Sequence, residues 1–182
     1  MGGSVSVQLV MLGLDLSGKT TLLYRLKFEQ YMNVNSTIGF NCEKIKGKTG
    51  KTRGINFTIW DVGGQDRTRP LWRSYMRSSE GIIFVVDSVD KERLEEAKLE
   101  LIKLLKSSEN PGLPVLVVAN KQDMPGSLDL AEVEKHLGLH ELPQSQLWAS
   151  HPACAITGEG LDECMDSMYE LIEKRKKTKK KK

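Results

Sequence analysis

The feature that most constrains the fold of this chain is a glycine-rich segment between an apolar run and an amphipathic run. Its eight residues, which fit the pattern GxxxxGK[ST], are Gly13, Leu14, Asp15, Leu16, Ser17, Gly18, Lys19 and Thr20. Glycines let a backbone curl until successive N–H groups point inward at phosphate oxygens, and a following helix adds the positive end of its dipole. The pattern therefore predicts a phosphate-binding loop between a strand and a helix. The alternative is a glycine turn that only joins the two elements.

Two side chains of this loop have specific expected roles. Lys19 would reach the β- and γ-phosphates of a nucleotide, and the Thr20 hydroxyl would bind Mg²⁺. We expect Thr21, at the start of the following helix, to contact the nucleotide as well. The loop predicts nucleotide phosphates without identifying the base.

Short apolar runs alternate with amphipathic runs along the whole chain. The expected strands are Val7–Leu12, Phe40–Ile45, Ile55–Trp60, Gly81–Asp87, Val115–Asn120 and Leu147–Ala153. The expected helices are Lys19–Phe28, a run from Leu94 to Leu105, a helix opened by the capping box of Asp129 and Glu132 and closed by Gly138, and a final helix with Leu161 to Ile172 on one face. This order predicts an α/β fold with a six-stranded, mostly parallel sheet, one antiparallel edge strand and helices on both faces. Ligands of such sheets bind at the carboxyl ends of the strands, where the motifs fall.

The segment after the strand Val115–Asn120 indicates which base is bound. It reads Asn120, Lys121, Gln122 and Asp123. The Asp123 carboxylate can accept two hydrogen bonds from the N1–H and 2-amino groups of guanine, a pair that adenine does not offer. Behind a phosphate-binding loop at this distance, the segment favours guanine. Cys154 and Ala155 follow the last strand, and the Ala155 N–H is a weaker candidate to bond guanine O6.

A third motif, Asp61-Val62-Gly63-Gly64-Gln65, follows the second strand of the expected hairpin. Asp61 is placed to hold a magnesium-bound water, and the Gly64 N–H can meet a γ-phosphate. Gln65 can orient the attacking water. The alternative is an ordinary turn at the end of a strand.

The charge is unevenly distributed along the chain. Its formal net charge is +3, but residues Lys174–Lys182 hold eight of the 27 Lys and Arg residues, which leaves 19 basic against 24 acidic residues elsewhere. An acidic body without a nucleic-acid motif argues against a groove for DNA or RNA. The three cysteines, Cys42, Cys154 and Cys164, are widely spaced, so we expect a reducing compartment without structural disulfides.

Several segments of the chain together resemble those of a known family. The segments GLDLSGKTT, STIGFN, WDVGGQDRTRPLWRSY, VVDSVD and ANKQD together are similar to the Arf and Arf-like branch of the Ras superfamily. The similarity covers Val7 to about Lys174, and LYRLKF, FNCEKIK, RPLWRSY and the lysine-rich end look most like the Arf-like group-four proteins. It implies a P-loop GTPase fold over residues 7–173, between a short arm of residues 1–6 and a polybasic tail of residues 174–182.

The resemblance also implies roles for matching positions. Thr37 would be the nucleotide-sensing threonine of the first switch and a second magnesium ligand, and Gln65 the catalytic glutamine of the second switch. Phe40, Trp60 and Tyr75 would form an aromatic patch that effector proteins touch in the GTP state, although aromatic residues near a sheet edge often belong to the core. These positions imply a monomeric switch that binds GTP or GDP with Mg²⁺.

No catalytic arginine can be assigned within the chain. Arg67 and Arg69 lie near Gln65, but the family pattern gives neither a catalytic role. We therefore expect slow intrinsic hydrolysis and an activating protein that increases the hydrolysis rate by roughly 10³–10⁵-fold. We also expect a guanine-nucleotide exchange factor as a partner.

The two ends of the chain suggest membrane attachment. Met1–Ser6 fits MGxxx[ST], so Gly2 is a candidate for myristoylation. A single acyl chain holds a membrane only marginally, and the tail Lys174–Lys182 could supply the second signal. We expect a cytoplasmic protein that binds a membrane peripherally, with nuclear import by the basic run as an alternative. Gly2–Ser6 is too short for the amphipathic N-terminal helix of Arf relatives, which puts movement coupled to such a helix in doubt.

Three other functions compete with a GTPase switch. One is a GTP-binding adaptor with negligible hydrolysis, which the presence of Gln65 disfavours. Another is a nucleic-acid-binding protein that uses the basic tail, and a third is an adenine-specific P-loop kinase, which the Asn120–Asp123 segment disfavours.

Overall fold

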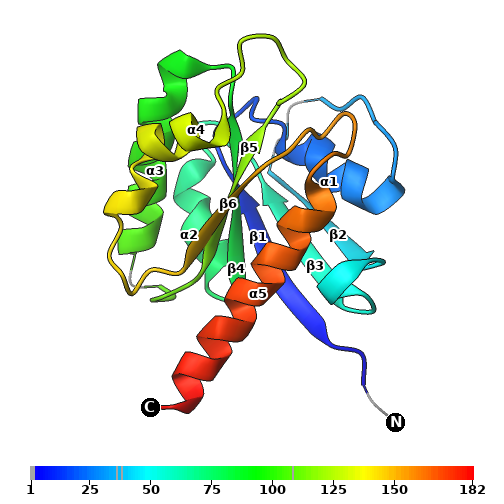
Figure 1. Cartoon of the computed structure of the whole chain (residues 1–182), viewed down its shortest axis with the longest axis vertical. Helices are drawn as coiled ribbons and strands as arrows, with labels where there is room; N and C mark the ends of the chain where they lie inside the picture. Colours follow the sequence, from blue (N-terminus) through cyan, green and yellow to red (C-terminus); the bar gives the residue numbers. More distant parts are fainter. Residues whose placement is uncertain (1–2, 36, 38, 108) are drawn as a thin grey trace.

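The computed structural model describes residues 3–35, 37, 39–107 and 109–182. Its centre is a six-stranded sheet in the order β2-β3-β1-β4-β5-β6 (Figure 1). The strands are β1 (Ser6–Leu12), β2 (Phe40–Lys46), β3 (Asn56–Val62), β4 (Gly81–Asp87), β5 (Val115–Asn120) and β6 (Trp148–Pro152). Edge strand β2 pairs antiparallel with β3, and all other neighbours pair in parallel. The predicted fold class is confirmed.

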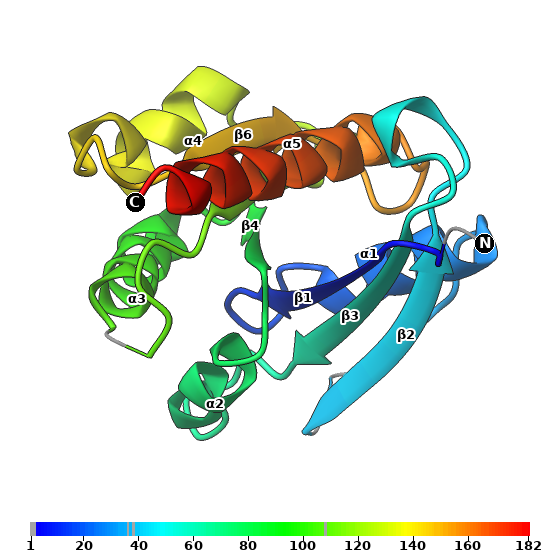
Figure 2. The ribbon, with the colours of Figure 1, turned by 90° about the horizontal axis from the view of Figure 1, so that it is seen from below.

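Helices cover both faces of the sheet (Figure 2). One face packs against α2 (Trp72–Met76), α3 (Leu94–Lys106) and α4 (Leu130–Leu137), and the other against α1 (Lys19–Phe28) and α5 (Leu161–Lys180). Strands β1, β4 and β5 are buried along most of their length because both faces are covered. This burial explains why these three strands read as continuous apolar runs.

The expected element bounds agree with the structure to within two residues, except for the final helix α5, which continues past Ile172 to Lys180. The capping box is confirmed: Asp129 accepts a hydrogen bond from the Glu132 N–H at 2.9 Å, and Glu132 accepts one from the Asp129 N–H at 3.0 Å. Gly138 ends α4 with a φ of 66°. The sequence did not predict α2, because five residues are too few to show a helical period. Strand β3 runs two residues further than expected, to Val62, and so includes Asp61.

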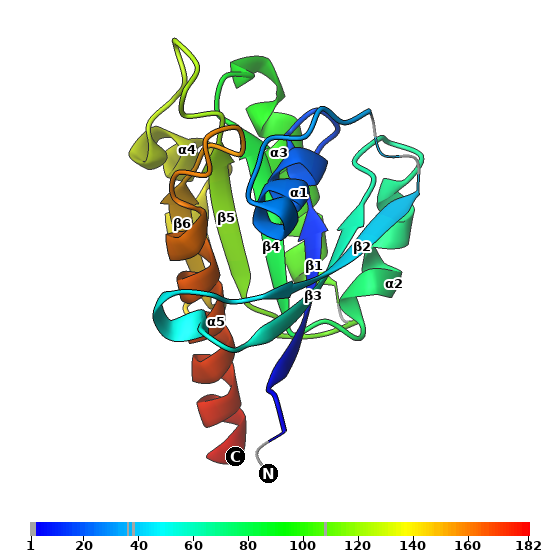
Figure 3. The ribbon, with the colours of Figure 1, turned by 90° about the vertical axis from the view of Figure 1, so that its right-hand side faces the viewer.

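The basic segment at the end of the chain continues α5 as far as Lys180. Arg175 ties this part of α5 to the body, because its guanidinium donates to Asn110 Oδ1 and to the Pro111 carbonyl, both at 2.8 Å. The end of α5 and the N-terminal arm lie at the same end of the molecule, away from the carboxyl ends of the parallel strands (Figures 1 and 3). The basic end of α5 is thus separated from the candidate nucleotide site.

Candidate functional site

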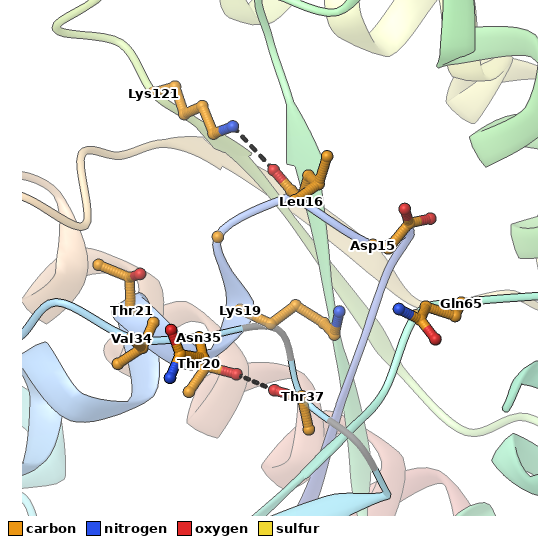
Figure 4. A pocket seen from close by; sticks show the side chains of 12 residues that line it. Asp15, Leu16, Lys19, Thr20, Thr21, Val34, Asn35, Thr37, Gln65 and Lys121 are labelled. Atoms are coloured by element: carbon orange, nitrogen blue, oxygen red, sulfur yellow. Dashed lines mark hydrogen bonds between the residues drawn. The ribbon is translucent and has the colours of Figure 1, made fainter.

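A cavity of about 240 Å³ opens at the carboxyl end of β1 (Figure 4). Its lining comes from the glycine-rich loop, the start of α1, the chain before β2 and the turn after β3. The lining residues are Asp15, Leu16, Gly18, Lys19, Thr20, Thr21, Val34, Asn35, Thr37, Gly64, Gln65 and Lys121. Segments far apart in the sequence are thus brought to one place, as predicted from the sheet topology.

The glycines of the loop are required by space and by backbone conformation. Gly18 has a φ of 96°, and a Cβ there would lie 2.4 Å from the Nδ2 atom of Asn120. A Cβ on Gly13 would lie 2.3 Å from the Val85 carbonyl oxygen. Leu16 adopts a φ of 65°, a left-handed conformation that is unusual for a non-glycine residue, and its side chain is exposed. The loop is therefore tightly curled, with a backbone that a side chain at Gly13 or Gly18 would not allow.

Lys19 is a buried charge at the floor of this cavity. Its side chain is buried, and its Nζ donates to the Leu14 carbonyl at 3.3 Å. Burial lowers the pKa of Lys19, while the carboxylates of Asp61 and Asp15 act in the opposite direction. In Figure 4 its ammonium group points towards Gln65 across the cavity. A buried ammonium with one carbonyl partner suits an anionic ligand.

Three oxygen-bearing side chains converge beside Lys19. The Thr20 hydroxyl donates to Asp61 Oδ2 at 2.5 Å and forms a short hydrogen bond with the Thr37 hydroxyl. Asn41 donates to the same carboxylate oxygen at 3.2 Å. The other oxygen, Asp61 Oδ1, is buried without a hydrogen-bond partner among the described residues. Two hydroxyls and a carboxylate with an unsatisfied oxygen are ligands of the kind that Mg²⁺ takes, directly or through water.

The candidate magnesium ligands are not a cluster of His, Cys, Asp and Glu side chains. The described residues contain no group of three or more His, Cys, Asp or Glu side chains placed to hold a metal ion. The site depends instead on threonine hydroxyls, which Mg²⁺ accepts when substrate phosphates and water complete its shell.

Gly64 and Gln65 close the cavity on the side of β3. The Asp15 N–H donates to the Gly64 carbonyl at 3.2 Å, and a Cβ on Gly64 would lie 2.3 Å from the Gly13 carbonyl oxygen. The turn after β3 therefore lies directly against the glycine-rich loop. The Gln65 side chain points into the cavity towards the Lys19 ammonium (Figure 4).

Asn120 joins the phosphate-binding loop to the loop after β6. Its Nδ2 donates to the Ser17 carbonyl at 3.0 Å, and its Oδ1 accepts from the Ala155 N–H at 3.1 Å. In this arrangement the Ala155 N–H already has a partner, so guanine O6 would have to share it with Asn120. Cys154 is buried beside it.

The two other predicted residues of this region lie differently. Lys121 crosses the glycine-rich loop, and its Nζ donates to the Leu16 carbonyl and to Asp87, both at 2.7 Å. Asp123 is exposed to solvent and is not part of the cavity lining. The structure therefore brings together the phosphate side of the predicted site and leaves the carboxylate proposed for the base facing solvent.

The three predicted patch aromatics contact one another. The ring centroids are 5.5 Å apart for Phe40 and Trp60, 5.8 Å for Phe40 and Tyr75, and 5.9 Å for Trp60 and Tyr75. Phe40 is 51% exposed, so the cluster reaches the surface. The predicted lipidation residue, Gly2, lies outside the described residues.

Several residues that support the site were not predicted. Asn41 and Asp87 orient Asp61 and Lys121, and Arg69 and Arg93 both bond the Asp15 carboxylate. The hydrogen bonds to Arg93, together with the nearby charges of Arg93 and Arg69, lower the pKa of Asp15. Each of these partners is distant in sequence from the residue it holds, so no local motif signals the pairing.

Comparison with known proteins shows which family this chain matches. A family profile described as "Arf: ADP-ribosylation factor family" matches residues 1–172. The human ADP-ribosylation factor-like protein 4C is 59% identical over 177 residues, which cover 97% of this chain and 92% of that protein. The human protein 4A is 54% identical and the mouse protein 4D is 52% identical, each over 94% of this chain and 86% of the relative.

A solved structure agrees with the sequence relatives. The Arl6 BBS3 small GTPase from Trypanosoma brucei, with bound nucleotide analogue GppNp, superposes with a TM-score of 0.81. It is 31% identical, and the match covers 93% of this chain and 99% of that chain.

Proposed function

This chain belongs to the ADP-ribosylation factor family, and on that premise we propose how its own residues bind and hydrolyse GTP. It is an Arf-like small GTPase, and this is consistent with a nucleotide-dependent switch. The observation that supports our assignment best is the convergence of Lys19, Thr20, Thr37 and Gln65 on one cavity behind the glycine-rich loop.

The phosphates of GTP would lie in this cavity. Backbone N–H groups between Gly13 and Lys19 would bind the β-phosphate, together with the positive end of α1. The Lys19 ammonium would exchange its bond to the Leu14 carbonyl for phosphate oxygens. Thr21 would contact the phosphate nearest the nucleoside.

Magnesium would be held by Thr20 and Thr37, with Asp61 acting through a bound water. When bound there, Mg²⁺ would neutralise charge on the β- and γ-phosphates. The Oδ1 atom of Asp61 supports this site, because it is buried with no donor among the described residues, and such a carboxylate oxygen is costly.

Guanine would be bound by the loops after β5 and β6. The Asp123 carboxylate is exposed and is therefore free to turn towards N1–H and the 2-amino group. Asn120 would hold the two loops in place, and the aliphatic part of Lys121 would cover one face of the base. Cys154 and Ala155 would line the other side.

Hydrolysis transfers the γ-phosphoryl group of GTP to water, with GDP as the leaving group. Gln65 would orient the attacking water, and the Gly64 N–H would hold a γ-phosphate oxygen. With no catalytic arginine supplied by the chain, hydrolysis would be slow until an activating protein contributes one. An exchange factor would release GDP, and effector proteins would bind the aromatic patch of Phe40, Trp60 and Tyr75 in the GTP state.

Competition between nucleotides tests this assignment. Purified protein should release a bound fluorescent GDP analogue when excess GDP is added and retain it when excess ADP is added. Asp123→Asn should remove this preference, because an amide cannot accept hydrogen bonds at both of its terminal atoms. Equal displacement by GDP and ADP in the unmodified protein would contradict the assignment.

We further propose that the protein acts in the cytoplasm as a monomer bound reversibly to a membrane surface. No helix in the described ranges is both long and apolar enough to cross a bilayer. A myristoyl group on Gly2 and the basic end of α5 would act together, because a single acyl chain holds a membrane only marginally and basic residues add attraction to anionic lipids. The described part of the N-terminal arm, from Gly3 onwards, lies at the same end of the molecule as the end of α5 (Figure 3). If removal of residues 174–182 leaves binding of the acylated protein to anionic vesicles unchanged, the basic segment plays no part.

A further inference from the structure

Arg69 is an enclosed cation in a network of charged side chains beside the nucleotide cavity. Its side chain is only 8% exposed, and its NH1 atom lies 2.8 Å from Asp66, 2.9 Å from Glu96 and 3.6 Å from Glu100. Arg93 belongs to the same network through its bonds with Glu96 and Asp15. The network joins the glycine-rich loop, the turn after β3 and helix α3. These three segments are far apart in the sequence, so side-chain contacts hold them together.

Two contacts of Arg69 reach the nucleotide site itself. Its Nε donates to the Gly64 carbonyl at 2.8 Å, and its NH2 lies 3.4 Å from Asp15 Oδ1. The same Gly64 carbonyl accepts a second hydrogen bond, from the Asp15 N–H at 3.2 Å. The Gly64 carbonyl is therefore fixed from two directions, by the glycine-rich loop and by Arg69.

We propose that Arg69 is a positioning residue that holds Gly64 against the glycine-rich loop and so favours nucleotides that carry a γ-phosphate. This inference rests on the proposed contact between the Gly64 N–H and the γ-phosphate. A glycine backbone is free in both of its dihedral angles, so fixing its carbonyl restricts where its N–H points. A bound GDP has no group for that N–H to meet, so the arrangement would contribute to GTP binding and little to GDP binding.

The shape of the guanidinium explains why arginine is needed at this position. Its donors lie in a rigid planar fork, and Arg69 uses them in three directions, towards Gly64, Asp15 and Glu96. A lysine at position 69 would keep the positive charge among the carboxylates but would lack a fixed donor for the Gly64 carbonyl. Arg69→Lys therefore separates the charge from the positioning. Arg67 is exposed two residues earlier, and Arg67→Ala is the matched control.

The test compares two dissociation rates in four proteins. Fluorescent analogues of GDP and of the non-hydrolysable nucleotide GppNHp are loaded with Mg²⁺ on the unmodified protein, Arg69→Lys, Arg69→Ala and Arg67→Ala, and their release is followed. We expect both Arg69 variants to release the GppNHp analogue about tenfold faster, the size expected for one lost charge-assisted hydrogen bond, and to release the GDP analogue within about threefold of the unmodified rate. Arg67→Ala should leave both rates unchanged.

Other outcomes would overturn the proposal. A purely structural role of Arg69 would accelerate release of both nucleotides equally, and no role would leave both rates unchanged. Thermal unfolding of the GDP-bound proteins shows whether Arg69→Ala folds, and Arg69→Lys decides the matter if it does not. If the unmodified protein binds neither analogue, the proposed function fails and the inference with it. If it binds both and the Arg69 variants behave like Arg67→Ala, only the inference fails.

Discussion

The side-chain amide of Asn120 donates a hydrogen bond to the carbonyl of Ser17, 103 residues earlier in the chain. Asn120 is fully buried at the end of β5, so its amide is held in one orientation. Because its Oδ1 atom also accepts from the Ala155 N–H, one side chain fixes the relative position of three loops around the proposed nucleotide.

Replacing Asn120 should therefore weaken nucleotide binding without any loss of a direct phosphate contact. Asn120→Ala leaves the Ser17 carbonyl and the Ala155 N–H without their partner, and we expect it to lower GDP affinity by at least about tenfold, equivalent to about 1.4 kcal/mol. Isothermal titration with GDP measures the affinity. Gln122→Ala, in which a side chain of the same segment loses its bonds to Ser88 and Leu128, is the control. A similar loss in both variants would show that the loop as a whole, rather than Asn120, is responsible.

Gln65→Leu should retain GTP and stop hydrolysing it. The Gln65 side chain points into the cavity. Leucine is of similar size but has no polar group with which to orient water. We expect the single-turnover rate of GTP-loaded protein to fall by about 10²-fold while GTP affinity changes little, as for loss of positioning alone. The nucleotide content of the protein over time is measured by chromatography. Hydrolysis at the unmodified rate would contradict the catalytic role of Gln65.

Thr20→Asn should remove most of the dependence of nucleotide release on magnesium. The Thr20 hydroxyl contacts both Asp61 and Thr37, so its loss disrupts the whole set of oxygen ligands. In the unmodified protein, a chelator should accelerate GDP release by about tenfold or more, the equivalent of about 1.4 kcal/mol. In Thr20→Asn the rates with and without chelator should be close to each other. If the chelator accelerates GDP release from the variant as much as from the unmodified protein, residues other than Thr20 hold the metal.

One of the three thiols should react in the folded protein. Cys42 is exposed on β2, whereas Cys154 and Cys164 are buried, and burial, with a smaller effect of Glu163, raises the pKa of Cys164 to about 12. Burial and the neighbouring Glu43 also raise the pKa of Cys42, so its labelling should be slow at neutral pH and should accelerate as the pH rises and the thiolate forms. A thiol-reactive dye and mass spectrometry count the modified groups. Cys42→Ser should abolish labelling of the native protein, and three groups should react after denaturation.

Two basic residues of α5 should differ in their effect on stability. Arg175→Ala removes the bonds to Asn110 and Pro111 and should lower the free energy of unfolding by about 1 kcal/mol. Lys177→Ala removes the same charge from an exposed position and should change it by less than about 0.5 kcal/mol. Urea unfolding measures both. Equal values would mean that Arg175 only contributes charge.

Much of the fold follows from local patterns in the sequence. The strands β4 and β5 and the helix α1 were predicted with their observed bounds, because each is a continuous apolar or amphipathic run ended by glycine or polar residues. The loop at Gly13–Thr20 was likewise predicted, since its residues are consecutive. Apart from the short helix α2 and the extension of α5, what was not predicted depends on contacts between distant segments. Arg69 and Arg93 resemble ordinary surface arginines until α3 is placed beside the glycine-rich loop.

Helix α5 continues without a break from the core into the lysine-rich end of the chain. Ile172 is its last buried residue, and at 1.5 Å per residue the helix extends about 12 Å further before it ends at Lys180. The charges are thus spaced along a stiff rod instead of being distributed over a random coil. An anionic surface would therefore bind cations that are held at fixed positions relative to the body of the protein. Binding would then fix the orientation of the whole molecule on that surface.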